Sequence, residues 1–440
     1  MKIKIAVTVV IGIAISLSQT VYSESNIEQK KANALDAFIE EALSNNPQVQ
    51  AARCEWEAAC YKISQEYALP DPIAQYTCFG ENIETRVGPQ EHKYGGSLKI
   101  PFPSKLILKG KAQARRADIL REKYEAVKRE LIKDIKFVYY DIYWIDRAIE
   151  ITEQEEDVVE GVEKVAQRKY ETNQAKQQDV IKTQIELSNF VDRLLRLKQH
   201  RKTLVAKIND ILSRSQGRDL DIQDSIVLPV FDLKLNDLRE TALKTKQELA
   251  AAEIDVERAD YEKSLAMQDF IPDVTVGFDY LQVGEGRTNS PNDGQDAWMT
   301  TFSINVPLWI DKQWACIKEK SLLLDARQKD HKSIKNKVLY EVQDLYYKVL
   351  SYQDIVTLYK TALLPQSKQA LKVVKAGYET GNVNFIDWLD SERVLLQTQL
   401  AYYKAVVDYM KSIAFLERIV GIDLYPELNY QRSKYETAKK

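Results

Sequence analysis

Two stretches of alternating side chains decide the fold: VTVGFDY at residues 274–280 and WMTTFSINV at residues 298–306. In both, apolar or aromatic residues alternate with small or polar ones, which is the period of a β-strand with one apolar face. A loop rich in Gly, Asn and Asp separates them, so we predict a β-hairpin over residues 273–307. Each strand is about ten residues long, the length of a tilted strand that spans a membrane.

The apolar face of this hairpin is predicted to contact lipid. Its members are Val276, Phe278, Tyr280, Phe302 and Ile304. A second, less regular hairpin is predicted earlier in the chain, over residues 72–102, with strands at 72–80 and 94–102. Lys99 falls on its opposite face and is expected to point into a lumen.

The two hairpins occupy equivalent places in an internal repeat. LDAFIEEAL at 35–43 matches LNDLRETAL at 235–243, and YET at 170–172 recurs at 378–380. The offset drifts only from 200 to 208 residues along the chain, which indicates a tandem duplication. We therefore expect a first repeat over residues 24–234, a second over 235–424, and a polar tail over 425–440.

Long helices are predicted to fill the rest of each repeat, because these segments are rich in Lys, Glu, Gln, Leu, Ile and Ala and carry few Pro or Gly. The longest would extend on the order of 90–100 Å at about 1.5 Å per residue. Helix–helix tips are expected near residues 171–178 and 379–385. The predicted helices cover residues 34–67, 106–170, 177–214, 238–267, 317–378 and 385–419.

The first residues predict export from the cytoplasm. Lys2 and Lys4 precede an apolar run over residues 5–17, and Val21-Tyr22-Ser23 suits cleavage by signal peptidase after Ser23. A signal peptide is therefore expected over residues 1–23. The net charge of −3, from 62 basic and 65 acidic residues, argues against nucleic acid as a partner.

No motif for catalysis is found in the sequence. It has no glycine-rich phosphate loop, no nucleophile elbow and no paired metal-binding histidines, so we expect no enzyme activity, no cofactor and no metal site. Four cysteines, at positions 54, 60, 78 and 316, are too far apart in sequence for a zinc cluster. Their spacing leaves open whether any of them pair.

Four strands cannot close a sheet, and lipid does not tolerate open strand edges. Other copies of the chain must complete it, and cyclic symmetry is the usual solution. Three copies would supply twelve strands, an even number within the range of known barrels. The predicted fold is mainly α with a small membrane β part: antiparallel helical hairpins form an α-barrel, and four strands per chain contribute to a 12-stranded trimeric β-barrel.

Several features in fixed order resemble the TolC family of outer-membrane efflux ducts. They are the duplicated plan, Leu69-Pro70-Asp71 before the first strand, Pro101 and Pro307 after the hairpins, and a Tyr-x-x-Gly motif at 378–381 followed by Asp387. The resemblance covers essentially all of the chain after residue 23. The stretches at 81–90 and 102–106 are most similar to members paired with heavy-metal RND efflux pumps.

This resemblance implies a homotrimer in the outer membrane, in contact with lipid, with its helices in the periplasm. A periplasmic membrane-fusion adaptor and an inner-membrane RND-type pump would deliver small solutes or metal ions to a passive exit duct. Two alternatives stay open on the sequence. One is an exit duct for type I protein secretion, and the other is a periplasmic coiled-coil scaffold without a barrel.

The resemblance also assigns residues to a periplasmic gate. The family's constriction carries two acidic positions that match Asp387 and Asp390, which lie three apart and so on one helix face. In a trimer they would form two rings of carboxylates that favour cations. Tyr378 matches the family's gate tyrosine and Asp179 its acidic partner, but Val383 stands where family members often have a locking arginine.

The two tips are expected to be the docking points for the adaptor. Their candidate residues are Gly381 and Asn382 in the second tip, and Asn173 and Gln174 in the first.

Overall fold

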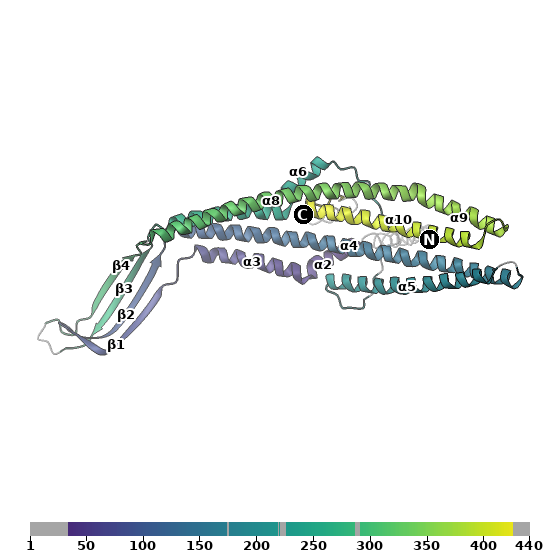
Figure 1. Cartoon of the computed structure of the whole chain (residues 1–440). Helices are drawn as coiled ribbons and strands as arrows, with labels where there is room; N and C mark the ends of the chain where they lie inside the picture. Colours follow the sequence, from purple (N-terminus) through teal and green to yellow (C-terminus); the bar gives the residue numbers. More distant parts are fainter. Residues whose placement is uncertain (1–33, 174–175, 219, 221–225, 287–290, 426–440) are drawn as a thin grey trace, which may run out of the picture. The chain divides into compact units, whose positions relative to one another are not determined.

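The computed structural model describes residues 34–173, 176–218, 220, 226–286 and 291–425. Long helices dominate it, and its strands form a single sheet (Figure 1). The predicted signal peptide and all but the first residue of the predicted polar tail lie outside the described residues. The elements in chain order are α2 (Ala34–Asn45), α3 (Pro47–Tyr67), β1 (Ile73–Thr85), β2 (Gly88–Ile100), α4 (Pro103–Glu171), α5 (Gln177–Ile211), α6 (Leu235–Thr245), α7 (Gln247–Gln268), β3 (Val274–Val283), β4 (Ala297–Ile304), α8 (Ile310–Leu358), the π-helical turn η1 (Tyr359–Leu363), α9 (Leu364–Glu379) and α10 (Phe385–Val420).

The chain divides into two compact units, and each unit takes segments from both predicted repeats. The first unit comprises Met1–Gln50, Ala126–Lys246 and Lys337–Lys440, and the second comprises Ala51–Glu125 and Gln247–Asn336. The sheet therefore belongs to the second unit, and both helix–helix tips belong to the first. Compact units and sequence repeats thus divide the chain differently.

The sheet has the strand order β1-β2-β3-β4, and every neighbouring pair is antiparallel. The first hairpin is tighter than predicted, because β1 continues to Thr85 and β2 begins at Gly88. The Thr85 hydroxyl donates to the carbonyl of Gly88 at 2.6 Å and accepts from the backbone N–H of Val87 at 3.4 Å. This short turn stands where a loop between residues 80 and 94 was expected.

The register places apolar and polar side chains on opposite faces of the sheet. Val276 lies opposite Phe302 on β4, and Phe278 stacks on Trp298 with ring centroids 6.2 Å apart. The five residues predicted to face lipid therefore share one face. Lys99 lies on the other face, where its Nζ is 3.1 Å from a carboxylate oxygen of Asp273.

The single helix predicted over residues 34–67 is wrong, because the chain breaks at Asn46 into α2 and α3. Pro47 is the first residue of α3, a position where its missing N–H costs nothing. The side chain of Asn46 accepts from the backbone N–H of Gln48 at 2.9 Å and donates to the carbonyl of Ile211 at 2.9 Å. The break is therefore capped and tied to the end of α5.

The helix predicted over residues 238–267 is also divided, at the equivalent position in the second half. Lys246 has an extended backbone between α6 and α7 and is only 5% exposed. Its Nζ donates to the carbonyl of Arg418 at 3.0 Å, and the hydroxyl of Thr245 donates to the carbonyl of Val420 at 2.7 Å. These bonds satisfy carbonyls at the end of α10, which otherwise lack helical partners.

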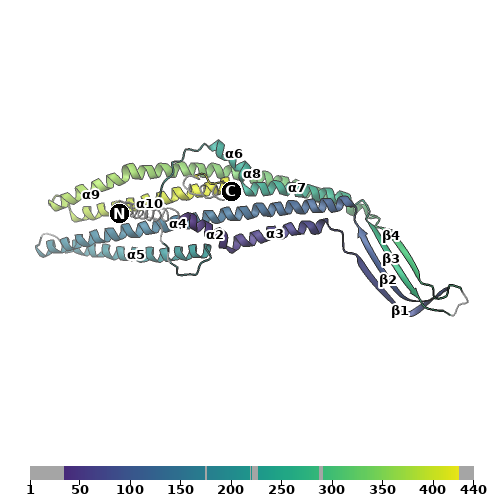
Figure 2. The same ribbon diagram turned by 180° about the vertical axis from the view of Figure 1, so that it is seen from behind.

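The helix predicted over residues 317–378 begins earlier, at Ile310, and contains the π-helical turn η1. In that turn the N–H of Leu364 donates to the carbonyl of Tyr359, five residues back. Pro365 follows and has no N–H to continue the ordinary helical pattern. The inserted π turn accommodates this proline while α9 continues (Figure 2).

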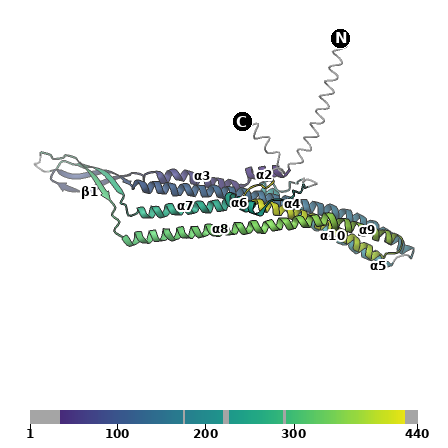
Figure 3. The same cartoon turned by 90° about the horizontal axis from the view of Figure 1, so that it is seen from above.

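The core of the first unit is built from aliphatic side chains of α4, α8 and α10. Ile135, Ile142, Val342, Val349 and Val407 are fully buried there. In the second unit α7 and α8 lie side by side, as Figure 3 shows from above. Contacts between them include an ion pair from Arg327 to Asp255 at 3.2 Å. Among the described residues, no helix carries an apolar stretch long enough to cross a membrane.

Candidate functional site

In the first unit the long helices α4 and α5 are joined after Asn173, and α9 and α10 are joined by a tight turn around Gly381, which we call the second turn. Asn173 follows α4 with φ of 56°, and Gly381 follows α9 with φ of 79°, both in the left-handed region that Asn and Gly tolerate best. The backbone N–H of Asn382 donates to the carbonyl of Gly377 at 2.9 Å. A Cβ at Gly377 would lie 2.4 Å from Cγ2 of Val383, so the second turn folds closely over α9. Gln174 lies outside the described residues.

Behind the second turn, three aromatic side chains form the main part of a buried group that we call the tip cluster. It consists of Tyr378, Phe385 and Trp388 together with Val162, Ala166 and Leu389. The Tyr378 and Trp388 ring centroids are 4.8 Å apart, and those of Tyr378 and Phe385 are 6.0 Å apart. The tip cluster therefore packs α9 and α10 against the last turns of α4.

Asp387 and Asp390 both lie exposed in the first two turns of α10. Trp388 and Leu389 between them are buried in the tip cluster, so the two carboxylates lie on the opposite side of the helix. Asn384 caps the helix, since its side chain accepts from the backbone N–H of Asp387 at 2.9 Å. The carboxylate of Asp387 is therefore not the cap, and both acids are presented to solvent.

Tyr378 and Asp179 come from different helical hairpins, and the charge of Asp179 acts on the phenol of Tyr378. Burial raises the pKa of Tyr378, and the negative charge of Asp179 raises it further. The carboxylate of Asp179 accepts from the backbone N–H of Lys176 at 3.3 Å, at the start of α5. The Nζ of Lys169 lies 4.0 Å from the centroid of the Tyr378 ring, a distance that suits a cation–π contact.

An ion pair that was not predicted from the sequence links α5 to α10. Arg393 donates to both carboxylate oxygens of Glu186, at 3.1 and 2.6 Å. This two-bond geometry is the strong form of a charge-assisted pair. The hydrogen bonds and charge of Arg393 lower the pKa of Glu186. Burial of the Glu186 side chain, which is only 10% exposed, acts in the opposite direction but is outweighed.

A second missed feature is a pair of buried carboxyl groups, Glu155 on α4 and Glu392 on α10. The pKa of Glu155 is raised to about 7. Burial is the largest cause, and repulsion by the carboxylate of Glu392 and a hydrogen bond with it add to the rise. Burial also raises the pKa of Glu392, whose Oε1 accepts from Trp388 Nε1 at 3.3 Å. No local sequence signal marks either residue, because their neighbours in sequence are ordinary helical residues.

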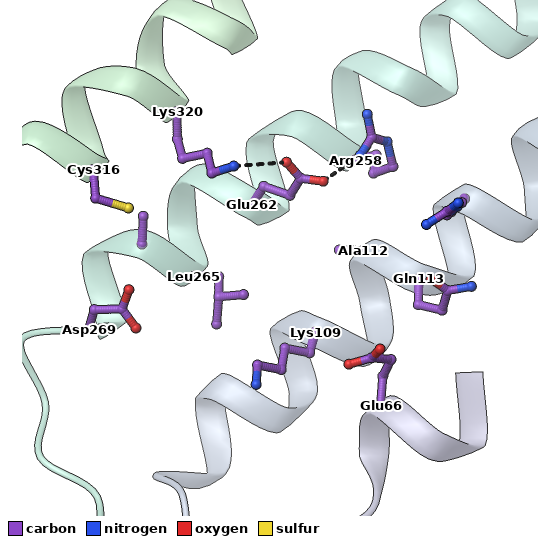
Figure 4. Close-up of a pocket in the computed structure, with 12 residues that line it drawn as sticks. Glu66, Lys109, Ala112, Gln113, Arg258, Glu262, Leu265, Asp269, Cys316 and Lys320 are labelled. Atoms are coloured by element: carbon purple, nitrogen blue, oxygen red, sulfur yellow. Dashed lines mark hydrogen bonds and ion pairs between the residues drawn. The ribbon is translucent and has the colours of Figure 1, made fainter. Parts of the chain in front are cut away.

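A groove of about 350 Å³ lies in the second unit and contains none of the predicted site residues (Figure 4). Glu262 lies between two cations, forming an ion pair with Arg258 and lying 3.7 Å from the Nζ of Lys320. Cys316 lines the same groove, and its thiol is free, as are those of the other three cysteines. Because Glu262 is already paired with these two cations, we assign the groove no ligand.

The chain matches the model of a known protein family. The model of the outer membrane efflux protein family matches the chain twice, over residues 38–213 and 238–421. The two matches start 200 residues apart and end 208 residues apart, the same offsets that the predicted repeat shows.

Individual relatives are distant but cover nearly the whole chain. The cobalt-zinc-cadmium resistance protein CzcC of Cupriavidus metallidurans is 20% identical over 403 residues, which cover 88% of this chain and 90% of CzcC. The outer membrane protein TolC of Vibrio cholerae is 21% identical, covering 89% of this chain and 91% of TolC. The solved structure of the outer-membrane channel OprN has the same fold, with a TM-score of 0.76 at 16% identity, covering 89% of this chain and 91% of OprN.

Proposed function

Since this chain belongs to the outer membrane efflux protein family, whose members are channels and not enzymes, we propose that it is the exit duct of a tripartite efflux system. In this proposal three copies assemble in the outer membrane, their twelve strands close one sheet, and their helices form a tunnel in the periplasm. A periplasmic adaptor and an inner-membrane RND-type pump deliver the cargo, and the duct conducts it passively.

The observation that carries the proposal is the geometry of the second tip. Asp387 and Asp390 are exposed on one side of α10, and the tip cluster holds the other side of that helix in place. Three copies around an axis would turn this side into two rings of carboxylates, which attract cations and repel anions. The adaptor is proposed to dock at the tips, on Asn173, Gly381 and Asn382.

Divalent metal ions are the cargo that this charge favours. CzcC, which this chain resembles over most of its length, is named as a cobalt-zinc-cadmium resistance protein. Paired carboxylates suit a cationic cargo, and their exposure suits transient contact, because a conducting site must release the ion as readily as it admits it. We therefore propose export of divalent metal ions as the physiological task.

The test combines growth and conductance. Deletion of the gene should lower tolerance to cobalt, zinc or cadmium, and the plasmid-borne gene should restore it. In planar bilayers, the purified channel should prefer cations, and Asp387→Asn with Asp390→Asn should move the reversal potential toward that of an unselective pore.

Asp325→Asn, which neutralises an exposed carboxylate on α8, is the matched control and should leave the reversal potential unchanged. A channel whose selectivity is the same with and without the two tip carboxylates would overturn the gate assignment. A deletion strain with unchanged metal tolerance would overturn metal export.

A further inference from the structure

The contact between α4 and α10 contains a pair of carboxyl groups that share a hydrogen bond. Glu155 on α4 and Glu392 on α10 are only 8% and 5% exposed, and the bond joins their carboxyl groups. Oε1 of Glu392 also accepts a hydrogen bond from Nε1 of Trp388 at 3.3 Å. An ionised carboxylate can only accept hydrogen bonds, so two carboxyl groups bond each other only if one of them is protonated. The packed arrangement therefore holds a proton between the two helices.

The surroundings of Glu155 oppose its ionisation. Ile151 and Val159, one helical turn to either side of it, are buried together with Phe190 of α5 and Leu396 of α10. Within the described part of the chain, Oε2 of Glu155 is buried and has no hydrogen-bond partner. A carboxylate charge at this place would have neither water nor a donor to stabilise it, which is costly in an apolar interior. The protonated form is therefore the stable one while the helices are packed.

The charged groups around the pair do not neutralise it. On α5, Glu186 is already bonded to Arg393 of α10, at 3.1 and 2.6 Å. On α9, Lys375 favours the charged form of Glu392, but burial outweighs it and the pKa of Glu392 is raised. Burial, followed by repulsion from Glu392, raises the pKa of Glu155 to about 7. The Glu155 side chain therefore ionises near neutral pH.

The carboxyl pair is tied to the tip cluster. Trp388, whose indole N–H donates to Glu392, packs in that cluster with its ring centroid 4.8 Å from that of Tyr378. Val162 and Ala166 supply the α4 side of the cluster, farther along the helix that carries the first carboxyl group. The cluster and the pair thus join the same two helices. Movement of α10 away from α4 at the tip must therefore break the hydrogen bond between the carboxyl groups.

We propose that Glu155 and Glu392 form a proton-operated latch for the periplasmic gate of the proposed duct. With the proton in place, α10 stays against α4, and the gate that Asp387 and Asp390 line stays narrow. When Glu155 loses the proton, the two charges repel each other, α10 moves away from α4, and the gate widens. This inference rests on the proposed function and adds the condition under which the duct opens.

The direction of the pH effect follows from the two states of Glu155. In the packed, closed state its pKa is about 7, and in an open state that water reaches the pKa returns toward the ordinary value of 4.5. The packed state is therefore favoured fully below about pH 4.5, and this preference is lost as the pH rises through about 7. The duct is closed in acid and opens as the pH approaches neutrality.

Single-channel conductance in planar bilayers tests the latch, with the same pH on both sides and EDTA present so that no metal ion replaces the proton. For the wild type, the ratio of open to closed time should rise about 10- to 100-fold between about pH 5 and pH 8. Glu155→Gln keeps a donor for Glu392 but carries no charge, so the channel should stay mostly closed at both pH values. Glu156→Gln, which removes the neighbouring half-buried carboxyl group, is the matched control and should follow the wild type.

A second variant separates the latch from a general loss of packing. Glu392→Gln removes the second charge, so ionisation of Glu155 no longer creates a repulsion. The rise in open time between the two pH values should then be smaller than in the wild type, whereas a variant that only loosened the packing would be open at both. Size-exclusion chromatography in detergent at both pH values checks that the oligomer stays assembled.

The outcomes separate the latch from the proposed function. Equal open times of the wild type at the two pH values would overturn the latch, and so would a Glu155→Gln channel that keeps the wild-type pH dependence or is open at both. In each case a conducting, cation-selective pore leaves the proposed duct standing. Assembled protein that conducts at neither pH would overturn the duct and the latch together. A pH-dependent pore in a strain whose metal tolerance does not depend on the gene would support the latch and overturn metal export.

Discussion

Replacing Glu155 by glutamine is expected to stabilise the packing of α4 against α10 at high pH and to leave it almost unchanged at low pH. In the folded protein, burial and the neighbouring carboxylate of Glu392 raise the pKa of Glu155 to about 7 from an ordinary value of 4.5. The stability that this protonated pair contributes is therefore complete below about pH 4.5 and is lost as the pH rises through about 7. Glutamine stays neutral at every pH and can still donate a hydrogen bond to Glu392.

The magnitude follows from the size of the pKa change. Each tenfold change in proton affinity corresponds to about 1.4 kcal/mol. Complete ionisation of Glu155 therefore lowers the free energy of unfolding by about 3 kcal/mol at most. Trp388 donates a hydrogen bond to Glu392, and Lys375 stabilises its charge, so part of the repulsion is relieved. We therefore expect Glu155→Gln to raise the free energy of local opening by about 1–3 kcal/mol at about pH 8 and to change it little at about pH 5.

Hydrogen exchange read by mass spectrometry can measure this locally, in peptides that cover residues 151–159 and 388–396. After correction for the intrinsic exchange rate, wild-type protection should fall about 10- to 100-fold between about pH 5 and pH 8, whereas the Glu155→Gln protein should show little change. Glu156→Gln, at a half-buried neighbouring residue, is the control and should behave like wild type. Wild-type protection that is equal at both pH values would refute the reasoning.

Other substitutions probe the packing of the tip and the contact between Lys105, at the start of α4, and Asp273, just before β3. Gly377→Ala should lower thermal stability, because the added Cβ would lie 2.4 Å from Cγ2 of Val383. Adding Val383→Ala should restore the stability, which thermal unfolding followed by circular dichroism can measure. If the double variant does not recover, this close contact is not the cause of the loss. Trp388→Ala removes a buried ring from the tip cluster and should cost about 3–5 kcal/mol, seen as faster hydrogen exchange in α9 and α10 but not in α7. Lys105→Met removes the nearest cation of the buried carboxylate of Asp273 and leaves Lys99 as its partner. It should cost about 1.5–3 kcal/mol of stability, and adding Asp273→Asn should recover part of that loss, as thermal unfolding in detergent can show.

The regular elements could be predicted because their signals are local. Alternation over residues 274–280 defines a strand and both of its faces, and the register confirms that the predicted apolar residues share one face. The spacing of Asp387 and Asp390 is enough to place them on one side of a helix. The break at Asn46 was missed although Pro47 carries a recognised signal for the start of a helix.

Other breaks are not decided by such a signal alone. Lys246 interrupts a helical pattern without proline or glycine, and its side chain donates to the carbonyl of Arg418, 172 residues later in the chain. The π turn at residues 359–363 likewise depends on how α8 and α9 accommodate Pro365. In both places a partner or a backbone geometry distant from the local pattern decides the outcome.

The sequence by itself determined the helices, the two-faced strands, the repeat and the resemblance to efflux ducts, because each depends on periodicity or on residues close together in the chain. Only the tertiary structure decided which charges meet. Glu186 and Arg393 are 207 residues apart in sequence and form two hydrogen bonds, and Glu155 on α4 faces Glu392 on α10. The physical reason is that the energy of a charge depends on burial and on the partner beside it, and helix packing sets both.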